Sequence, residues 1–280
     1  MDEGYHVEAH VLQSMGVPVV EIDLESVIDG DPEQALEHLP TGGTWWLYRG
    51  WLLSEEDYEA LFDAIADRGD QLVVAPSAFA AAAFLPNWAP ALGSRTPASI
   101  WTEDTDAEEA WDEAMDELGP PPWVIKDHLK SAREDWATAC FVPEGAPFEH
   151  FRDICQGLVD CRGHHFERGI VVRRFVHLKR LPFVSRGAPV CDEHRVFFWR
   201  GEPVAHAPYH DLAVPPLAEV PYPDLGDVVD SPFFTADFGR LERGGWTVIE
   251  INDGGCSGRP AQLDPWQLYS AIVADYQMAC

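Results

Sequence analysis

Residues 233–253 read FFTADFGRLERGGWTVIEIND and are the most informative stretch of the chain. Two apolar runs, 233–239 and 246–251, flank a polar segment that contains Gly244 and Gly245. A glycine pair between two such runs indicates a β-hairpin. The aromatic and branched residues of both runs favour burial of the hairpin over an exposed face with solvated carboxylates.

The hairpin register predicts a metal site. A turn centred between Arg243 and Gly244 sets Asp237 directly opposite Glu250, with Cβ atoms about 5 Å apart. Asn252 lies two residues beyond Glu250 and therefore on the same face. Two opposed buried carboxylates repel each other unless a cation lies between them. Carboxylate and amide oxygens suit magnesium, so Asp237, Glu250 and Asn252 are the predicted ligands.

The rest of the chain divides into two patterns. Strands and helices alternate before residue 86 and predict a small α/β unit, whereas longer strands after residue 122 predict an α+β unit with mostly antiparallel pairing. Six prolines lie in the connection at 86–122. We therefore predict domains at 1–105 and 106–280. The expected strands are 17–22, 72–75, 123–128, 169–176, 194–199 and 204–207, and the expected helices are 54–68, 77–85, 106–118, 131–136, 149–161 and 264–276, the last with Trp266 facing inward.

Composition excludes several classes of protein. The 280 residues carry a formal net charge of −29 and contain only three lysines, Lys126, Lys130 and Lys179. Such a charge repels polyanions, so generic binding of nucleic acid or an anionic membrane is not expected. No run of 18 apolar residues and no signal peptide is present, which predicts a cytoplasmic protein. The six cysteines form no CxxC pair and are expected as free thiols.

Three cationic residues lie within predicted strands that are otherwise apolar. Lys126, Arg173 and Arg195 each occupy such a position, where an unpaired charge is costly. Each could form a structural salt bridge, Lys126 with the adjacent Asp127, or each could hold the phosphates of a nucleotide. The sequence has no GxxxxGK[ST] or GxGxxG motif, so neither a P-loop nor a Rossmann site is expected.

Four segments, taken in order, resemble the ATP-grasp superfamily. The ending E-I-N resembles its magnesium-binding strand, and WVIKDHLKS resembles its phosphate-binding lysine strand, on which Lys126 and then Lys130 match. GIVVRRFVHLK resembles the strand leading to the adenine-binding hinge, which implies backbone contacts near Phe175 and Val176. EHRVFFWRGEPVA resembles the strand whose arginine, here Arg195, contacts the triphosphate. Arg173, a cation inside an apolar predicted strand, is also a candidate nucleotide contact.

Together these motifs resemble one bacterial and phage clade of ATP-grasp proteins, named for two arginines and a lysine. The similarity covers about residues 44–260. It implies an α+β fold in which two subdomains clamp ATP, preceded by the small α/β domain. Arg174 departs from the acidic residue expected at its position, and the DGGCSGRP loop differs from the substrate loop of amino-acid ligases. Arg49 and Arg174 are the weaker candidates for substrate contact.

The resemblance implies an enzyme that uses ATP and Mg²⁺. We expect a carboxylate–amine ligase that forms an acyl phosphate, with Lys126 and Arg195 as the catalytic cations and a small molecule or peptide as substrate. An ATP-binding assembly chaperone of the translation-factor-assembly type, with a protein partner, is the alternative. RNA end-joining is opposed by the net charge and the lack of a KxDG motif.

Overall fold

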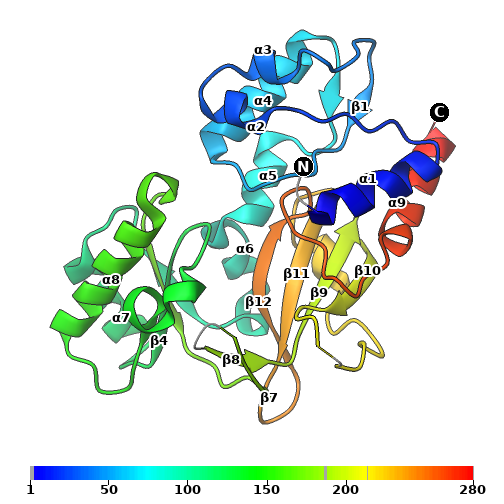
Figure 1. Ribbon diagram of the computed structural model, residues 1–280. Helices are drawn as coiled ribbons and strands as arrows, with labels where there is room; N and C mark the ends of the chain where they lie inside the picture. The colour runs from blue at the N-terminus through cyan, green and yellow to red at the C-terminus, as the bar shows by residue number, and fades with distance from the viewer. Residues whose placement is uncertain (1–2, 186–187, 213, 280) are drawn as a thin grey trace. The chain divides into compact units, whose positions relative to one another are not determined.

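The computed structural model describes residues 3–185, 188–212 and 214–279 (Figure 1). The chain forms two compact units, each built from separate segments. Unit 1 comprises Met1–Ala83, His194–Asp237 and Ile251–Cys280, and unit 2 comprises Phe84–Glu193 and Phe238–Glu250. The predicted domain boundary at residue 105 stays a prediction.

Unit 2 contains a four-stranded antiparallel sheet with the order β3-β6-β4-β5. Helices α7 and α8 pack on this sheet and enclose its core. In the register of the two central strands, Lys126 pairs with Val171 and Asp127 with Ile170. The elements are α6 Leu85–Leu92, β3 Ser99–Trp101, α7 Ala107–Glu117, β4 Trp123–Asp127, β5 Phe141–Val142, α8 Phe148–Arg162, β6 Ile170–Arg174, β7 Arg180–Ser185 and β8 Ala188–Cys191.

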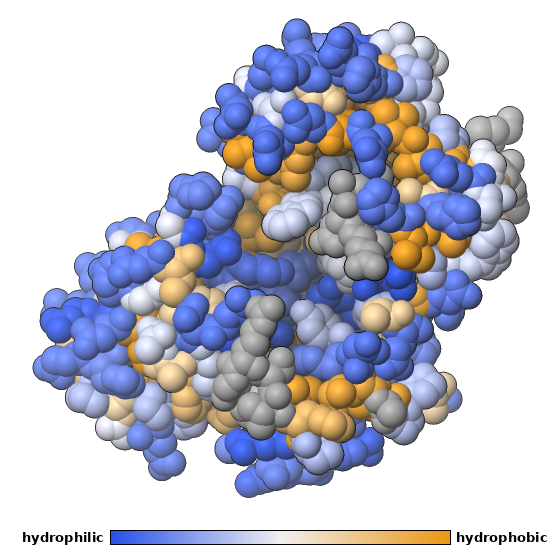
Figure 2. Space-filling view, viewed as in Figure 1, coloured by the Kyte–Doolittle hydropathy of each residue, from blue (hydrophilic) through white to orange (hydrophobic). Residues whose placement is uncertain are grey.

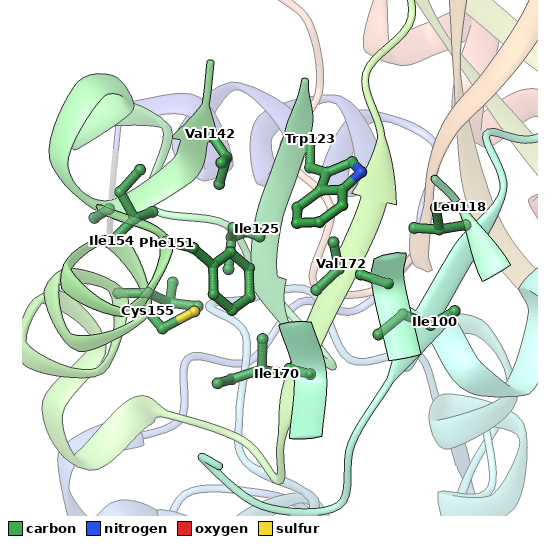
Figure 3. Packing of buried hydrophobic residues seen from close by; sticks show 14 residues of the cluster. Ile100, Leu118, Trp123, Ile125, Val142, Phe151, Ile154, Cys155, Ile170 and Val172 are labelled. Atoms are coloured by element: carbon green, nitrogen blue, oxygen red, sulfur yellow. The ribbon is translucent and has the colours of Figure 1, made fainter. Parts of the chain in front are cut away.

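The core of unit 2 follows from periodic apolar residues. In α8, Phe151, Ile154 and Leu158 recur at helical spacing and are fully or almost fully buried. Their ring and branched groups pack against Trp123 and Ile125 of β4 (Figure 3). This packing anchors β4 in the core, and the strand carries Lys126 and Asp127 at its end.

Unit 1 contains the chain's first helices and its last. Ser54 caps α4 by accepting a hydrogen bond from Asp57 N, as the sequence predicts. The first helix, α1, packs on the last, α9 (Figure 1). The elements are α1 Glu3–Ser14, α2 Leu24–Ile28, α3 Pro32–Ala35, β1 Trp45–Trp46, α4 Glu55–Asp67, β2 Gln71–Leu72, α5 Pro76–Ala83, β10 Glu202–Pro208 and α9 Pro265–Ala279.

A second four-stranded sheet has the order β10-β9-β11-β12. It contains the predicted hairpin, with β9 Glu193–Trp199, β11 Phe233–Arg240 and β12 Trp246–Asp253. At the open end of the hairpin, Gly254 N donates to Phe233 O at 3.0 Å, which matches the predicted register. At the turn, Leu241 N donates to Gly245 O at 3.0 Å, one residue out of that register. Between these two hydrogen bonds the β12 side of the hairpin therefore contains one residue more than the β11 side. Direct opposition of Asp237 and Glu250 stays a prediction.

Several predicted elements are wrong. Residues 17–22 form no strand, because no neighbouring strand supplies backbone partners among the described residues. Residues 131–136 form no capped α-helix. They lie in a 3-10 turn, Arg133–Asp135, and the start of a π-helical turn, Trp136–Cys140, where Trp136 stacks on Phe141.

Two further differences concern the chain ends. Helix α1 is absent from the sequence-based expectation, because its segment is only weakly amphipathic. The sequence predicts that Trp266 faces inward, but it is 48% exposed, and the buried face of α9 includes Pro265, Leu268, Tyr269 and Ile272.

The surface agrees with the acidic composition. Hydrophilic residues cover most of the face shown in Figure 2. Within the described part of the chain, none of the helices has the length and apolar character needed to cross a membrane. Five cysteines, Cys140, Cys155, Cys161, Cys191 and Cys256, are free thiols, as predicted, while Cys280 lies outside the described residues.

Candidate functional site

Lys126 lies on β4 with its ammonium group buried in unit 2. Its Nζ donates to Leu129 O at 3.2 Å and lies 3.6 Å from Glu250 Oε1. Burial lowers the pKa of Lys126 to about 8, because desolvation outweighs the attraction of Glu250. An ammonium has three donors, and Nζ forms one hydrogen bond within the described residues. Lys126 therefore has donors left for an anionic ligand.

Asp127 does not neutralise Lys126 by a direct ion pair. Its Oδ1 accepts from Leu129 N at 2.8 Å and from Lys130 N, and its Oδ2 accepts from Arg162 Nε at 2.8 Å. The carboxylate thus shapes the turn after β4, as aspartate commonly does in turns. This turn positions Lys130, which is partly exposed.

Glu250 lies on β12, where 7% of its surface is exposed. Besides Lys126, its neighbours include Arg133, whose Nη2 lies 3.9 Å from Oε2. Arg133 also reaches Glu193 at 3.8 Å, and its side chain is 39% exposed. Glu250 therefore lies between a buried and a partly exposed cation within unit 2.

Arg173, on β6, is held by neutral acceptors. Its Nη2 donates to Thr96 Oγ1 at 2.7 Å, its Nε to Ser99 Oγ at 3.2 Å, and its Nη1 to Ile249 O. Burial lowers the pKa of Arg173 to about 10, although Glu250 opposes the shift. Arg173 thus fixes the backbone of β12 next to Glu250 and adds positive potential there.

Arg195 and Asp237 form a buried bidentate pair in unit 1. Arg195 Nε lies 2.8 Å from Oδ1 of the aspartate, and Nη2 lies 2.7 Å from Oδ2. The third nitrogen, Nη1, donates to Gly258 O at 2.8 Å, and the guanidinium lies 4.8 Å from the centre of the Tyr209 ring.

These contacts correct one step of the sequence argument. Asp237 and Glu250 were treated as uncompensated like charges that need a cation between them. In the structure Asp237 is paired with Arg195, and Glu250 lies near Lys126. Each carboxylate therefore has a cation of the protein nearby, so repulsion between the two does not by itself require a metal ion, and the metal assignment must rest on other observations.

Asn252 provides such an observation. Its side chain is buried at 4% exposure, and its Oδ1 accepts no hydrogen bond from the described residues. An unpaired buried oxygen costs about 1–3 kcal/mol unless a ligand or water satisfies it. The next residue, Asp253, has one satisfied oxygen, which accepts from Cys256 N at 3.0 Å, and one without a partner. Burial raises the pKa of Asp253 to about 6.

The expected adenine hinge follows β6 directly. Phe175 N donates to Pro122 O at 3.1 Å, so this amide is already bonded within the protein. The Phe175 ring packs against Phe141 at 5.1 Å, and Val176 is half-buried. Arg174 is exposed and donates to Leu118 O. Its contact with substrate stays a prediction.

Arg49 is almost completely occupied by protein acceptors in unit 1. It forms an ion pair with Glu8, on α1, at 2.8 Å. Burial opposes its charge, but Tyr269 and Glu8 outweigh that effect, and the pKa of Arg49 is raised. These contacts favour a structural role. The contact of Arg49 with substrate stays a prediction.

The family follows from the sequence match. A family model of the ATP-grasp domain, family 3 of the clade named for two arginines and a lysine, matches residues 117–272, which is more than half of the chain. The chain belongs to this ATP-grasp family. The two predicted phosphate-binding lysines, the hinge, Arg195 and the three predicted metal ligands all lie within the matched residues. A comparison with curated proteins finds no match.

Solved structures show the same ATP-grasp fold. The chain is similar to D-cycloserine synthetase DcsG, with a TM-score of 0.64, 12% identity, and coverage of 98% of this chain and 95% of that one. It is also similar to the ATP-grasp ligase PsnB bound to a phosphomimetic variant of minimal precursor, Mg and ADP, with a TM-score of 0.58, 14% identity, and coverage of 98% and 93%. A RimK domain ATP-grasp protein from Sphaerobacter thermophilus DSM 20745 gives a TM-score of 0.55 at 14% identity, with coverage of 90% and 87%. These structural similarities establish the fold, as predicted.

The donor set of this ATP-grasp chain fits magnesium. Asp237, Glu250 and Asn252 are buried and offer hard oxygens, and the Asn252 oxygen has no other partner in the described residues. No group of three or more His, Cys, Asp or Glu side chains in the described ranges is arranged to hold a metal ion. The assignment of Asp237, Glu250 and Asn252 to magnesium stays a prediction.

Two residues of this ATP-grasp chain escaped the sequence reasoning. Arg133 lies in a polar segment with no periodicity, so nothing marks it as a neighbour of Glu250. Glu8 is the buried acidic residue of α1, and its partner Arg49 lies 41 residues away. A helix prediction over residues 3–14 could have found α1, but not this pairing.

Proposed function

We propose that this ATP-grasp protein is an ATP- and Mg²⁺-dependent ligase that joins a carboxylate to an amine through an acyl phosphate. The observation that carries the proposal is the buried Lys126, with unused donors, 3.6 Å from the Glu250 carboxylate. It brings a partner for phosphate next to a ligand for a divalent cation within one unit.

The proposed nucleotide contacts come from the residues that match the family motifs. Lys126 and Lys130 bind phosphate oxygens from the end of β4, and the backbone near Phe175 and Val176 contacts adenine. Arg195 contacts the triphosphate, and Arg173 supports the site through the backbone of β12 and its positive charge. Asp237, Glu250 and Asn252 would hold magnesium, which supplies charge neutralisation at the phosphates.

The proposed reaction needs no nucleophilic side chain. The substrate carboxylate attacks the γ-phosphorus of ATP, which gives an acyl phosphate and ADP. The amine then attacks the acyl carbon, forms the amide bond and releases phosphate. Lys126 and Arg195 stabilise the negative charge on the transferring phosphoryl group, which is where such catalysts act.

The similar structures support a ligase. DcsG is named as a synthetase, and PsnB is an ATP-grasp ligase that has been solved with a precursor peptide and AMPPNP. We therefore propose a small molecule or a peptide as the substrate. The identity of the carboxylate and the amine is the next question for experiment.

ADP release tests the proposal. The protein should form ADP in the presence of Mg²⁺ only when a suitable carboxylate and amine are present, and mass spectrometry should detect a condensation product. A panel of amino acids, short peptides and simple amines, with each component omitted in turn, defines the pair. Mg–ATP binding without condensation, together with a stoichiometric protein partner, would instead favour the assembly chaperone.

Nucleic-acid binding provides a separate prediction. We expect negligible affinity for generic single- or double-stranded RNA at physiological salt, alongside measurable binding of Mg–ATP. A net charge of −29 repels every phosphate that no local cation neutralises. Fluorescence polarisation with labelled RNA and labelled ATP measures both affinities. Tight RNA binding that weakens steeply with salt would contradict the ligase proposal and favour RNA end-joining.

A further inference from the structure

Helix α1 carries a buried carboxylate, Glu8, whose surface is 3% exposed. Arg49 donates from Nη2 to Glu8 Oε1 at 3.0 Å and to Oε2 at 2.8 Å, and from Nε to Oε2 at 3.0 Å. The Tyr269 hydroxyl donates to Oε2, and Arg259 Nε lies 3.7 Å from Oε1. One carboxylate therefore lies beside two guanidinium groups that are largely shielded from water.

The Nη1 group of Arg49, which does not contact Glu8, binds the loop that follows β12. Gly255 has no room for a side chain, since a Cβ there would lie 2.6 Å from Tyr48 O. The loop therefore packs directly on the segment that carries Arg49, and Gly50 N donates to Gly255 O at 3.1 Å. Arg49 Nη1 donates to three backbone carbonyls of this loop: Gly254 at 2.5 Å, Gly255 at 3.1 Å and Ser257 at 2.9 Å.

This loop, residues 254–258, also contacts residues next to the proposed metal ligands. The Ser257 hydroxyl donates to the backbone carbonyl of Asp253, which directly follows Asn252, at 2.8 Å. The Gly258 carbonyl accepts from Arg195 at 2.8 Å, and the other donors of Arg195 hold Asp237. A polar network within unit 1 thus links α1 to Asp253, the neighbour of Asn252, and, through Arg195, to Asp237.

We propose that Glu8 is a positioning residue for magnesium: by fixing Arg49, it holds loop 254–258 and, through the loop, the site of Asn252. The inference rests on the proposed function, because it assumes that Asn252 and Asp237 bind the cation. A glutamine at position 8 would turn an amide donor toward guanidinium donors. Arg49 would then lose its bidentate partner and reorganise, because an uncompensated buried charge is strongly unfavourable.

The test is Glu8→Gln in the full chain, with isothermal titration of ATP at a series of Mg²⁺ concentrations. We expect the Mg²⁺ concentration for half-maximal enhancement of ATP binding to rise about tenfold, as for groups that orient metal ligands. ATP binding without Mg²⁺ should change much less, because Glu8 contacts none of the predicted phosphate-binding cations and its network reaches Arg195 only through the Gly258 carbonyl. Glu56→Gln, the same change at an exposed site on α4, is the matched control and should change neither quantity.

A merely structural role gives a different result: a lower melting temperature with an unchanged Mg²⁺ requirement in the folded protein, which would overturn the inference. If Glu8→Gln does not fold, Arg49→Lys takes its place, since it keeps the charge but loses the forked contacts. If Arg49→Lys needs the same Mg²⁺ concentration as the unchanged chain, the inference is equally overturned. Failure of the unchanged chain to bind Mg–ATP would instead overturn the proposed function itself, and with it this inference.

Discussion

Replacing Lys126 with methionine should weaken Mg–ATP binding roughly 30- to 140-fold, which corresponds to about 2–3 kcal/mol for a charged hydrogen bond. Methionine keeps an apolar stem in the core of β4 but removes the ammonium with its unused donors. Isothermal titration calorimetry with ATP and saturating Mg²⁺ measures the loss, and circular dichroism checks that the fold is retained.

The other two lysines provide the controls. Lys179→Met removes an ammonium whose side chain is 49% exposed and lies 3.4 Å from Asp192, so it should bind Mg–ATP like the parent. Lys130→Met should show an intermediate loss, because Lys130 is partly exposed at the turn after β4. Parent-like binding by Lys126→Met with a large loss in Lys130→Met would reverse the two assignments.

Replacing Glu250 with glutamine should lower ATP affinity in Mg²⁺ at least about tenfold, about 1.4 kcal/mol, while ATP binding in EDTA changes little. The amide keeps the shape and one acceptor oxygen but removes the charge that a divalent cation needs. Calorimetric titration of ATP, once with Mg²⁺ and once with EDTA, separates the effect on Mg–ATP binding from the effect on binding of ATP alone. Unchanged binding in Mg²⁺ would remove Glu250 from the metal site.

The same variant tests the electrostatics of the protein without ligand. Relief of carboxylate repulsion, the expectation from sequence alone, predicts a higher melting temperature for Glu250→Gln. The structure predicts a lower one, because the change removes the carboxylate that lies 3.6 Å from the buried Lys126 ammonium, whereas the partly exposed Arg133 keeps Glu193. Thermal unfolding without nucleotide decides between the two. Glu242→Gln, at the exposed turn of the same hairpin, is the matched control and should change neither stability nor binding.

The elements that the sequence predicts well are those with strong local signals. The hairpin has two apolar runs and a glycine turn, where Gly244 and Gly245 adopt φ of 93° and 84°. Helix α8 has apolar residues at helical spacing, and α4 has a serine cap. Elements without such signals were missed, among them α1, α6, β3 and the paired strands β7 and β8.

The sequence by itself determined the family, the α+β fold and the residue types of the candidate site. Motif order and apolar periodicity are local properties, and they are enough to place Lys126, Arg195 and Glu250 on buried strands. Only the tertiary structure decided the partner of each charge. It pairs Asp237 with Arg195, turns Asp127 toward Arg162, and joins Arg49 to Glu8. These partners lie 35 to 42 residues apart in the chain, and a buried charge is satisfied by whichever opposite charge the packing brings within contact, not by its neighbour in sequence.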